Sequence, residues 1–136
     1  MARSKKPRNK RHTPIVPRIP MMVETRDDLA LGLRMSIEAL IAAPGVETYN
    51  AVSLRLVTLG RVVGKQSFME DAKRAMLDVF ARFERVGKIG VNDSEAAILR
   101  TTAGDMDAAI ALVPVNEFAW AEAKTLKWCA ENGVAP

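Results

Sequence analysis

The side chains of this sequence best suited to ligand chemistry are cations near its N-terminal end. Residues 1–20 contain seven of them and no acidic residue: Arg3, Lys5, Lys6, Arg8, Lys10, Arg11 and Arg18. Arginine offers phosphate oxygens a planar fork of donors, and lysine offers a mobile point charge. The rest of the 136-residue chain carries 13 basic and 16 acidic residues. Positive charge is therefore concentrated at one end, where it can neutralise phosphate groups.

Nucleic acid, either DNA or RNA, is the partner that this chemistry indicates first. The basic segment has no aromatic side chain for base stacking apart from His12, so we expect phosphate contacts with little sequence preference. The same cations also suit an acidic protein surface, or a tail that only improves solubility. Two functional hypotheses follow: an accessory protein that binds nucleic acid, and an assembly factor of a phage particle or binder of a host protein, whose arm orders on its partner.

Residue types that support catalysis are scarce in the rest of the chain. His12 is the single histidine and Cys129 the single cysteine, which excludes a histidine-based triad or a zinc cluster in the body. Asp105 and Asp107 would point about 160° apart around a helix, which does not suit a shared magnesium ion. We expect a protein that is not an enzyme and uses no metal or cofactor, with Cys129 as a packing residue.

Two tryptophans form the other candidate site. Trp120 and Trp128 lie eight residues apart in the last predicted helix, within about 80° of each other around its axis. Tryptophan is enriched at binding hot spots, so this face is a candidate interface with a partner or with a second copy of the chain. The alternative is that both rings belong to the core or its boundary.

The basic segment and the rest of the chain are expected to differ in structure. Like charges repel along the segment, and four prolines interrupt it: Pro7, Pro14, Pro17 and Pro20. The sequence therefore predicts an extended or disordered arm over residues 1–22 and one helical domain over 23–136. The apolar stretch 15–23 is too broken for a signal peptide or membrane anchor, so we expect a cytoplasmic protein with no membrane partner.

The domain is predicted to be entirely helical. Apolar residues recur at helical spacing, and prolines or glycines divide them into helices over 26–43, 47–63, 67–86, 93–113 and 116–131. The second and third of these could instead form one long helix bent at Gly60 and Gly64. Short connections favour antiparallel neighbours, so the predicted fold class is an all-α bundle of four or five helices.

Local signals predict how the first and fourth helices begin. Thr25 is the expected N-cap of the first helix, and Asn92 with Glu95 is typical of a capping box. Leu31 and Met35 widen the apolar surface of the first helix. We therefore expect this helix to be buried on more than one side.

The third helix carries four cations: Lys73, Arg74, Arg82 and Arg85. They allow a helix-turn-helix interpretation of residues 47–86, in which this helix would enter a DNA groove. Acidic residues alternate with them, however, and the four-residue spacing of Glu70 with Arg74 and of Asp78 with Arg82 predicts ion pairs. An ordinary solvated face is the favoured interpretation.

Two stretches carry a loose resemblance to other proteins: the opening K-P-R-N-K-R-H-T-P-I-V-P and the later N-D-S-E-A-A-I-L-R-T-T-A-G-D-M-D-A-A-I-A-L-V-P. With the short helical body, they resemble small uncharacterised basic-armed proteins of proteobacterial phages and prophages. The resemblance covers the arm and the penultimate helix. It implies a bacterial or phage context, hence the cytoplasm of a bacterial host cell, and it assigns no functional residue.

Overall fold

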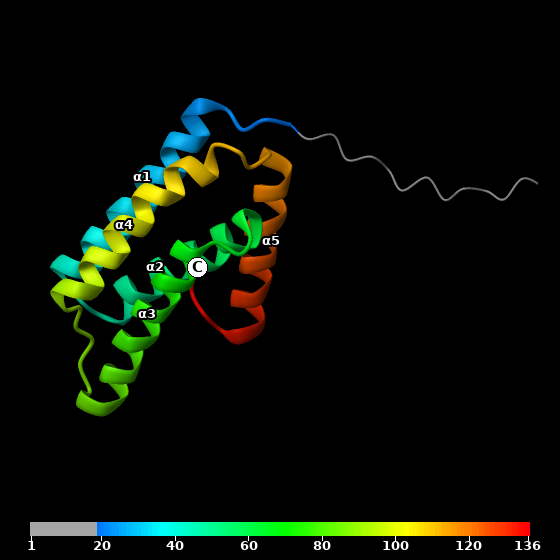
Figure 1. Cartoon of the computed structure of the whole chain (residues 1–136). Helices are drawn as coiled ribbons and strands as arrows, with labels where there is room; N and C mark the ends of the chain where they lie inside the picture. The colour runs from blue at the N-terminus through cyan, green and yellow to red at the C-terminus, as the bar shows by residue number, and fades with distance from the viewer. Residues whose placement is uncertain (1–18) are drawn as a thin grey trace, which may run out of the picture.

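Five α-helices make up the part of the chain that the structure, a computed structural model, describes, which is residues 19–136 (Figure 1). They are α1 (Val23–Ala42), α2 (Val46–Val63), α3 (Ser67–Val86), α4 (Asp93–Ile110) and α5 (Val115–Asn132). The β pairing within residues 19–136 is limited to one isolated bridge between Pro20 and Pro114. The predicted all-α bundle is confirmed, with the larger of the two expected helix numbers.

The helices pack in an open arrangement rather than a symmetric barrel. α1 lies between α2 and α4, α4 also packs along α3, and α5 packs along α2. Figure 1 shows α1 and α4 side by side, with α5 standing apart from them on the other side of α2. The first four helices therefore enclose the centre of the domain, and α5 is added to one flank.

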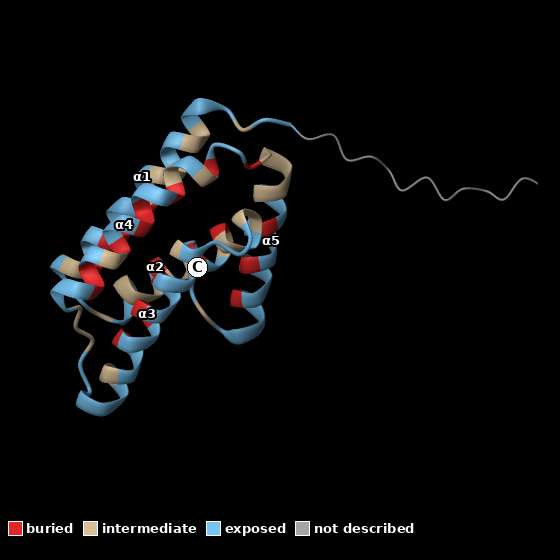
Figure 2. Cartoon of the chain, viewed as in Figure 1, coloured by how far each residue is buried: buried red, intermediate tan, exposed pale blue. Residues whose placement is uncertain are grey.

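The main core is built by the first four helices. Its largest fully buried apolar side chains come from α1 and α4, and α2 and α3 complete it (Figure 2). The main cluster consists of Leu33, Ile37, Leu40, Val52, Leu56, Leu59, Ala72, Met76, Leu99, Ala103, Met106 and Ile110. From α5, the half-buried Phe118 packs against this cluster. α5 itself buries a single narrow stripe of residues that recur every four positions: Ala121, Thr125 and Cys129.

Glycines separate the second, third and fourth helices. Gly64 ends α2 with φ of 74°, and Gly87 ends α3 in the left-handed conformation with φ of 76°. Residues with a Cβ avoid this region, whereas glycine enters it readily. Residues 46–86 therefore form two helices, and the alternative of one long bent helix is wrong. The capping box at α4 is confirmed: Asn92 accepts from the Glu95 N–H, and Glu95 accepts from the Asn92 N–H.

Two predictions about α1 are wrong. The helix begins at Val23, so Thr25 lies inside its first turn, and Met22 occupies the N-cap position without a side-chain cap. In addition, Leu31 and Met35 are 55% and 62% exposed. α1 is thus buried on one side, because its buried residues share one face of the helix: Leu33, Ser36, Ile37 and Leu40.

Candidate functional site

The predicted basic arm joins the domain at a defined point. The Val115 N–H donates to the Ile19 carbonyl over 2.8 Å, and Pro20 forms the bridge to Pro114. The chain therefore enters beside the connection between α4 and α5 (Figure 1). The predicted ligand-binding cations lie outside the described residues: Arg3, Lys5, Lys6, Arg8, Lys10, Arg11 and Arg18.

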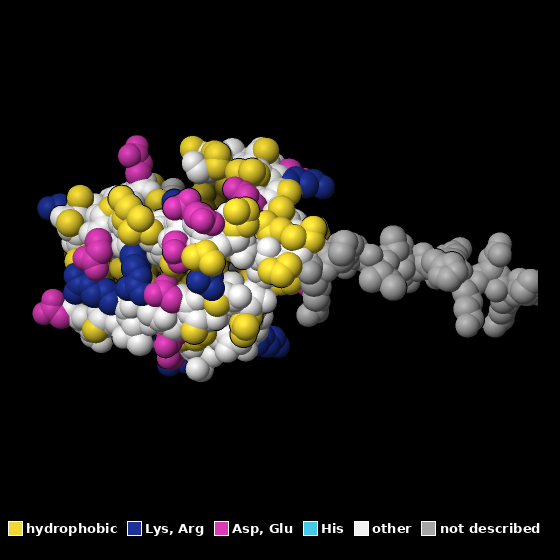
Figure 3. Space-filling view, turned by 90° about the horizontal axis from the view of Figure 1, so that it is seen from above, with side chains coloured by type: hydrophobic (Ala, Val, Ile, Leu, Met, Phe, Trp, Pro, Cys, Tyr) yellow, Lys and Arg dark blue, Asp and Glu magenta, His cyan; other side chains and the backbone are white. Residues whose placement is uncertain are grey.

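Exposed apolar side chains surround this entry point. Figure 3 shows hydrophobic groups gathered next to the place where the described chain begins. The start of the described chain and the α4–α5 connection carry four large apolar residues that are exposed: Ile19, Met22, Val23 and Leu112. The nearby Arg26, whose N–H donates to the Met22 carbonyl, lies within 3.9 Å of the Asp27 carboxylate.

Basic and acidic side chains are intermixed on the body. Within residues 19–136, five cations lie within 4 Å of a carboxylate: Arg26 with Asp27, Arg34 with Asp107, Arg82 with Glu95, Arg100 with Glu38, and Lys127 with Glu131. Figure 3 accordingly shows the two signs next to each other on the face in view. This mixture supports the solvated-face interpretation of the body over a dedicated cationic groove-binding surface.

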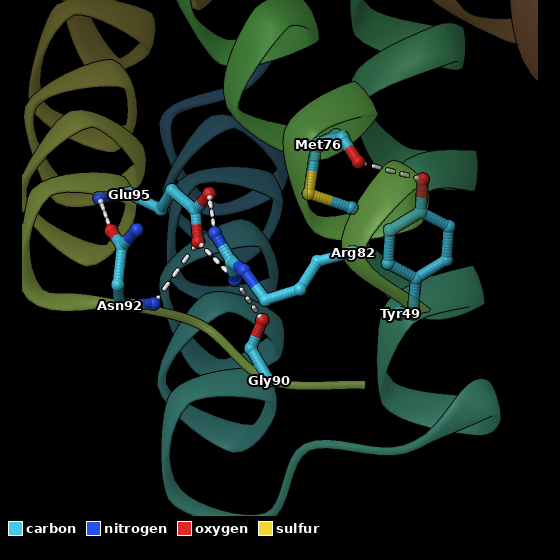
Figure 4. A network of polar contacts seen from close by, with 6 residues as sticks. All are labelled: Tyr49, Met76, Arg82, Gly90, Asn92 and Glu95. Atoms are coloured by element: carbon cyan, nitrogen blue, oxygen red, sulfur yellow. Dashed lines mark hydrogen bonds and ion pairs between the residues drawn. The ribbon is translucent and has the colours of Figure 1, made fainter. Parts of the chain in front are cut away.

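The most buried of these pairs ties α3 to α4. Arg82 makes a two-pronged contact with Glu95, Nη1 to Oε1 at 2.9 Å and Nη2 to Oε2 at 2.7 Å, and also donates to the Gly90 carbonyl at 2.9 Å (Figure 4). Glu95 is only 4% exposed. Neither ion pair predicted on α3 forms within 4 Å: Glu70 and Arg74 do not meet, and the Arg82 guanidinium reaches across to the next helix instead of to Asp78.

This network shifts the titration of both partners. Burial by itself would raise the pKa of Glu95, but the hydrogen bonds from Arg82 and Asn92 and the charge of Arg82 outweigh it, so the pKa is lowered. The hydrogen bond to Glu95 raises the pKa of Arg82. Both carboxylate oxygens of Glu95 and both terminal guanidinium nitrogens of Arg82 are used to join α3, the loop and α4. This geometry is that of a structural contact between the two helices.

The remaining candidates for metal or thiol chemistry are the acidic residues and Cys129. Among residues 19–136, no three His, Cys, Asp or Glu side chains lie close enough to hold a metal ion. Asp107 is engaged by Arg34. Cys129 is buried in the seam between α2 and α5, as expected of a packing residue.

The two tryptophans have different surroundings, and neither is buried. Trp120 is 54% exposed, and the Lys124 ammonium lies 5.0 Å from its ring centroid, a cation–π contact. Trp128 is 47% exposed and lines a hollow of about 370 Å³ between α2 and α5. Neither ring is in the core, so that part of the alternative is wrong, whereas a position at the core boundary stays a prediction. Trp128 is the one that borders a concave surface.

A larger hollow lies on the other side of α2, and no sequence motif predicted it directly. It has a volume of about 550 Å³ and runs between α2 and α3. It shares Tyr49, Ser53 and Val57 with the Trp128 hollow, so the two lie on either side of one ridge of α2. Its nearest sequence signal is the spacing of Gly60 and Gly64, which indicates close helix packing.

Comparison with known proteins adds no relative. No protein-family model, no curated protein and no solved structure matches this chain. Separately, no helix within residues 19–136 combines the length and the apolar character needed to cross a membrane.

Proposed function

We propose that this protein is a non-enzymatic accessory factor that binds DNA or RNA through phosphate contacts from its N-terminal arm, with little sequence preference. The observation that carries the proposal is the charge distribution. Six cations fall within residues 3–11 with no acid among the first 20 residues, whereas the rest of the chain carries more acidic than basic groups. A net negative body repels phosphates, so the favourable electrostatic energy must come from the arm.

The body serves as a platform for the arm in this proposal. Its ion pairs use arginines that would otherwise be available to phosphates, Arg34, Arg82 and Arg100 among them. The hydrogen bond between Val115 and Ile19 fixes where the arm leaves the domain. A partner bound by the arm would therefore be held near the α4–α5 connection.

The main test is deletion of residues 2–18, measured by fluorescence anisotropy with labelled duplex and single-stranded oligonucleotides. We expect binding to be lost while helical circular dichroism and the melting temperature are retained, because the deletion keeps Ile19 and Pro20 in place. Unchanged affinity after the deletion would overturn the proposal. Co-purification of a protein that survives nuclease treatment and depends on the arm would instead favour the acidic-protein partner.

Salt dependence separates arm contacts from body contacts. If five or six arm cations meet phosphates, the plot of log affinity against log salt should have a slope of roughly −4 to −5 on duplex DNA. Replacing Arg8, Lys10 and Arg11 by glutamine should make that slope shallower by about 2 to 3. The matched control replaces three exposed body cations by glutamine, Arg74, Arg85 and Lys88, and should change the slope by less than about 1.

A further inference from the structure

The hollow between α2 and α3 is an open apolar groove that extends along most of α2. Its floor includes the buried Leu56 and Met76, and its edges carry the half-exposed Val57 and Leu77. It runs from Tyr49 to Gly64, a length of about 22 Å along a helix of this pitch. That length matches about four turns of an added helix.

Two contacts between α2 and α3 shape the groove: a close approach of side chain to backbone at one end, and a hydrogen bond at the other. A Cβ added at Gly60 would lie 3.1 Å from the Met69 Cε, so the missing side chain lets Met69 lie against α2. At the other end the Tyr49 hydroxyl donates to the Met76 carbonyl over 3.0 Å (Figure 4). The methionines at the two ends, Met69 and Met76, have flexible thioethers that adapt to different apolar partners.

The charges around the groove are mostly positive. Lys65 and Lys73 line it, and Arg61 lines the neighbouring hollow across Val57. Within residues 19–136 none of these three cations lies within ion-pair distance of a carboxylate. Glu70 is the one acidic residue among the groove-lining side chains. A ligand with an apolar face and acidic flanks would therefore complement this surface.

We propose that the α2–α3 groove binds an amphipathic helical segment of a partner protein, with its apolar side chains against Met69, Met76 and Leu77 and its acidic flanks toward Lys65 and Lys73. Helices commonly bind such grooves through apolar anchors at positions i, i+3, i+4 and i+7. The basic arm of this chain is a poor occupant, because its charges have the same sign as the groove edge. The site is independent of nucleic-acid binding, so the protein would connect two partners.

The test uses the full chain with its six cations at residues 3–11 changed to glutamine, which removes electrostatic attraction of acidic peptides to the arm. The probe is a fluorescein-labelled 16-residue peptide with leucines at i, i+3, i+4 and i+7 spacing and glutamate and alanine elsewhere, about the length of the groove. A second peptide of identical composition distributes its leucines around the helix. We expect saturable anisotropy binding of the first peptide and at least tenfold weaker binding of the second.

Matched variants locate the binding. Val57→Glu with Leu77→Glu should weaken binding at least tenfold, and Lys65→Glu with Lys73→Glu severalfold, because these residues are the apolar edge and the charged edge. The control makes the same apolar-to-acidic change on α1, Leu31→Glu with Met35→Glu, where exposure is similar, and should have no effect. All these residues are at the surface, so the variants should fold, as a melting curve would verify.

Several outcomes would overturn the proposal: no saturable binding, equal binding of the two peptides, or equal weakening by the α1 control. A concentration-dependent dimer in analytical ultracentrifugation that the Val57/Leu77 variant abolishes would show that a second copy occupies the groove instead. These results are separable from the nucleic-acid proposal, because deletion of residues 2–18 should leave peptide binding intact.

Discussion

The seams that α4 and α5 make with the rest of the domain are built very differently. α4 packs along both α1 and α3, places Leu99, Met106 and Ile110 in the core, and is joined to α3 by the buried pair of Arg82 and Glu95. α5 packs along α2, buries a stripe of small side chains and borders hollows on both sides.

The contrast teaches how stability and accessible surface are distributed in this domain. Two neighbours and large apolar side chains bury most of the inner face of α4, and the hollow that borders it on the α3 side, about 200 Å³, is smaller than those beside α5. One neighbour and small side chains leave α5 with concave surfaces beside it, on which Trp128 remains half-exposed. We therefore expect the first four helices to carry most of the folding free energy and α5 to open first.

The largest expected effect comes from a cavity in the four-helix core. Leu40 is fully buried, so Leu40→Ala should lower the free energy of unfolding by about 2–5 kcal/mol. The matched change in α5 is Leu126→Ala; this side chain is half-exposed and should cost about 1 kcal/mol or less. Urea unfolding followed by circular dichroism measures both. Equal losses would contradict the proposed difference between core and flank.

The next effect tests the polar tie of the α4 seam. Glu95→Ala removes the contact with Arg82 and the capping interaction with Asn92, and should lower the free energy of unfolding by about 2 kcal/mol. Glu38→Ala is the control, because its pair with Arg100 has both side chains about half exposed. Exposed pairs contribute little, so the control should unfold close to the parent protein. If Glu38→Ala lost more free energy of unfolding than Glu95→Ala, the stabilising role of the Arg82–Glu95 contact would be contradicted.

The contact between Arg82 and Glu95 also predicts that the free energy of unfolding depends on pH in the acid range. Because the pKa of Glu95 is lowered in the folded chain, its ionised form stabilises the fold at neutral pH. That contribution is present above the ordinary glutamate pKa of about 4.3 and is lost as the pH falls through the lowered value. The stability difference between the parent and Glu95→Gln should therefore shrink below about pH 4. A difference that stays constant from pH 7 to pH 3 would show that the carboxylate charge is not involved.

The smallest expected effect lies in the α5 seam. The hydroxyl oxygens of Thr58 and Thr125 are 2.8 Å apart across it. Thr125→Val should lower the global free energy of unfolding by about 1 kcal/mol or less. Amide hydrogen exchange should quicken in α5 and remain unchanged in α1 and α4. A uniform increase across all five helices would mean that α5 is not a separate unit of opening.

The sequence by itself determined the elements and the distribution of charge. Helical periodicity, the glycine at residue 87 and the capping box of Asn92 and Glu95 depend on neighbouring residues, so the helices and several of their ends could be predicted. The segregation of cations into the first 20 residues is likewise a property of sequence alone. Thr25 was a local signal that failed, since the N-cap of α1 is Met22, three residues earlier.

Only the tertiary structure decided which apolar faces are covered and which partners the charged groups find. Leu31 and Trp128 have helical spacing suited to burial, yet both are about half exposed because no further helix of residues 19–136 covers them. Arg82 binds Glu95 on another helix rather than Asp78 on its own. The α2–α3 groove arises in the same way. Burial and long-range pairing depend on how many helices surround a residue, and that number is set by packing between segments far apart in the chain.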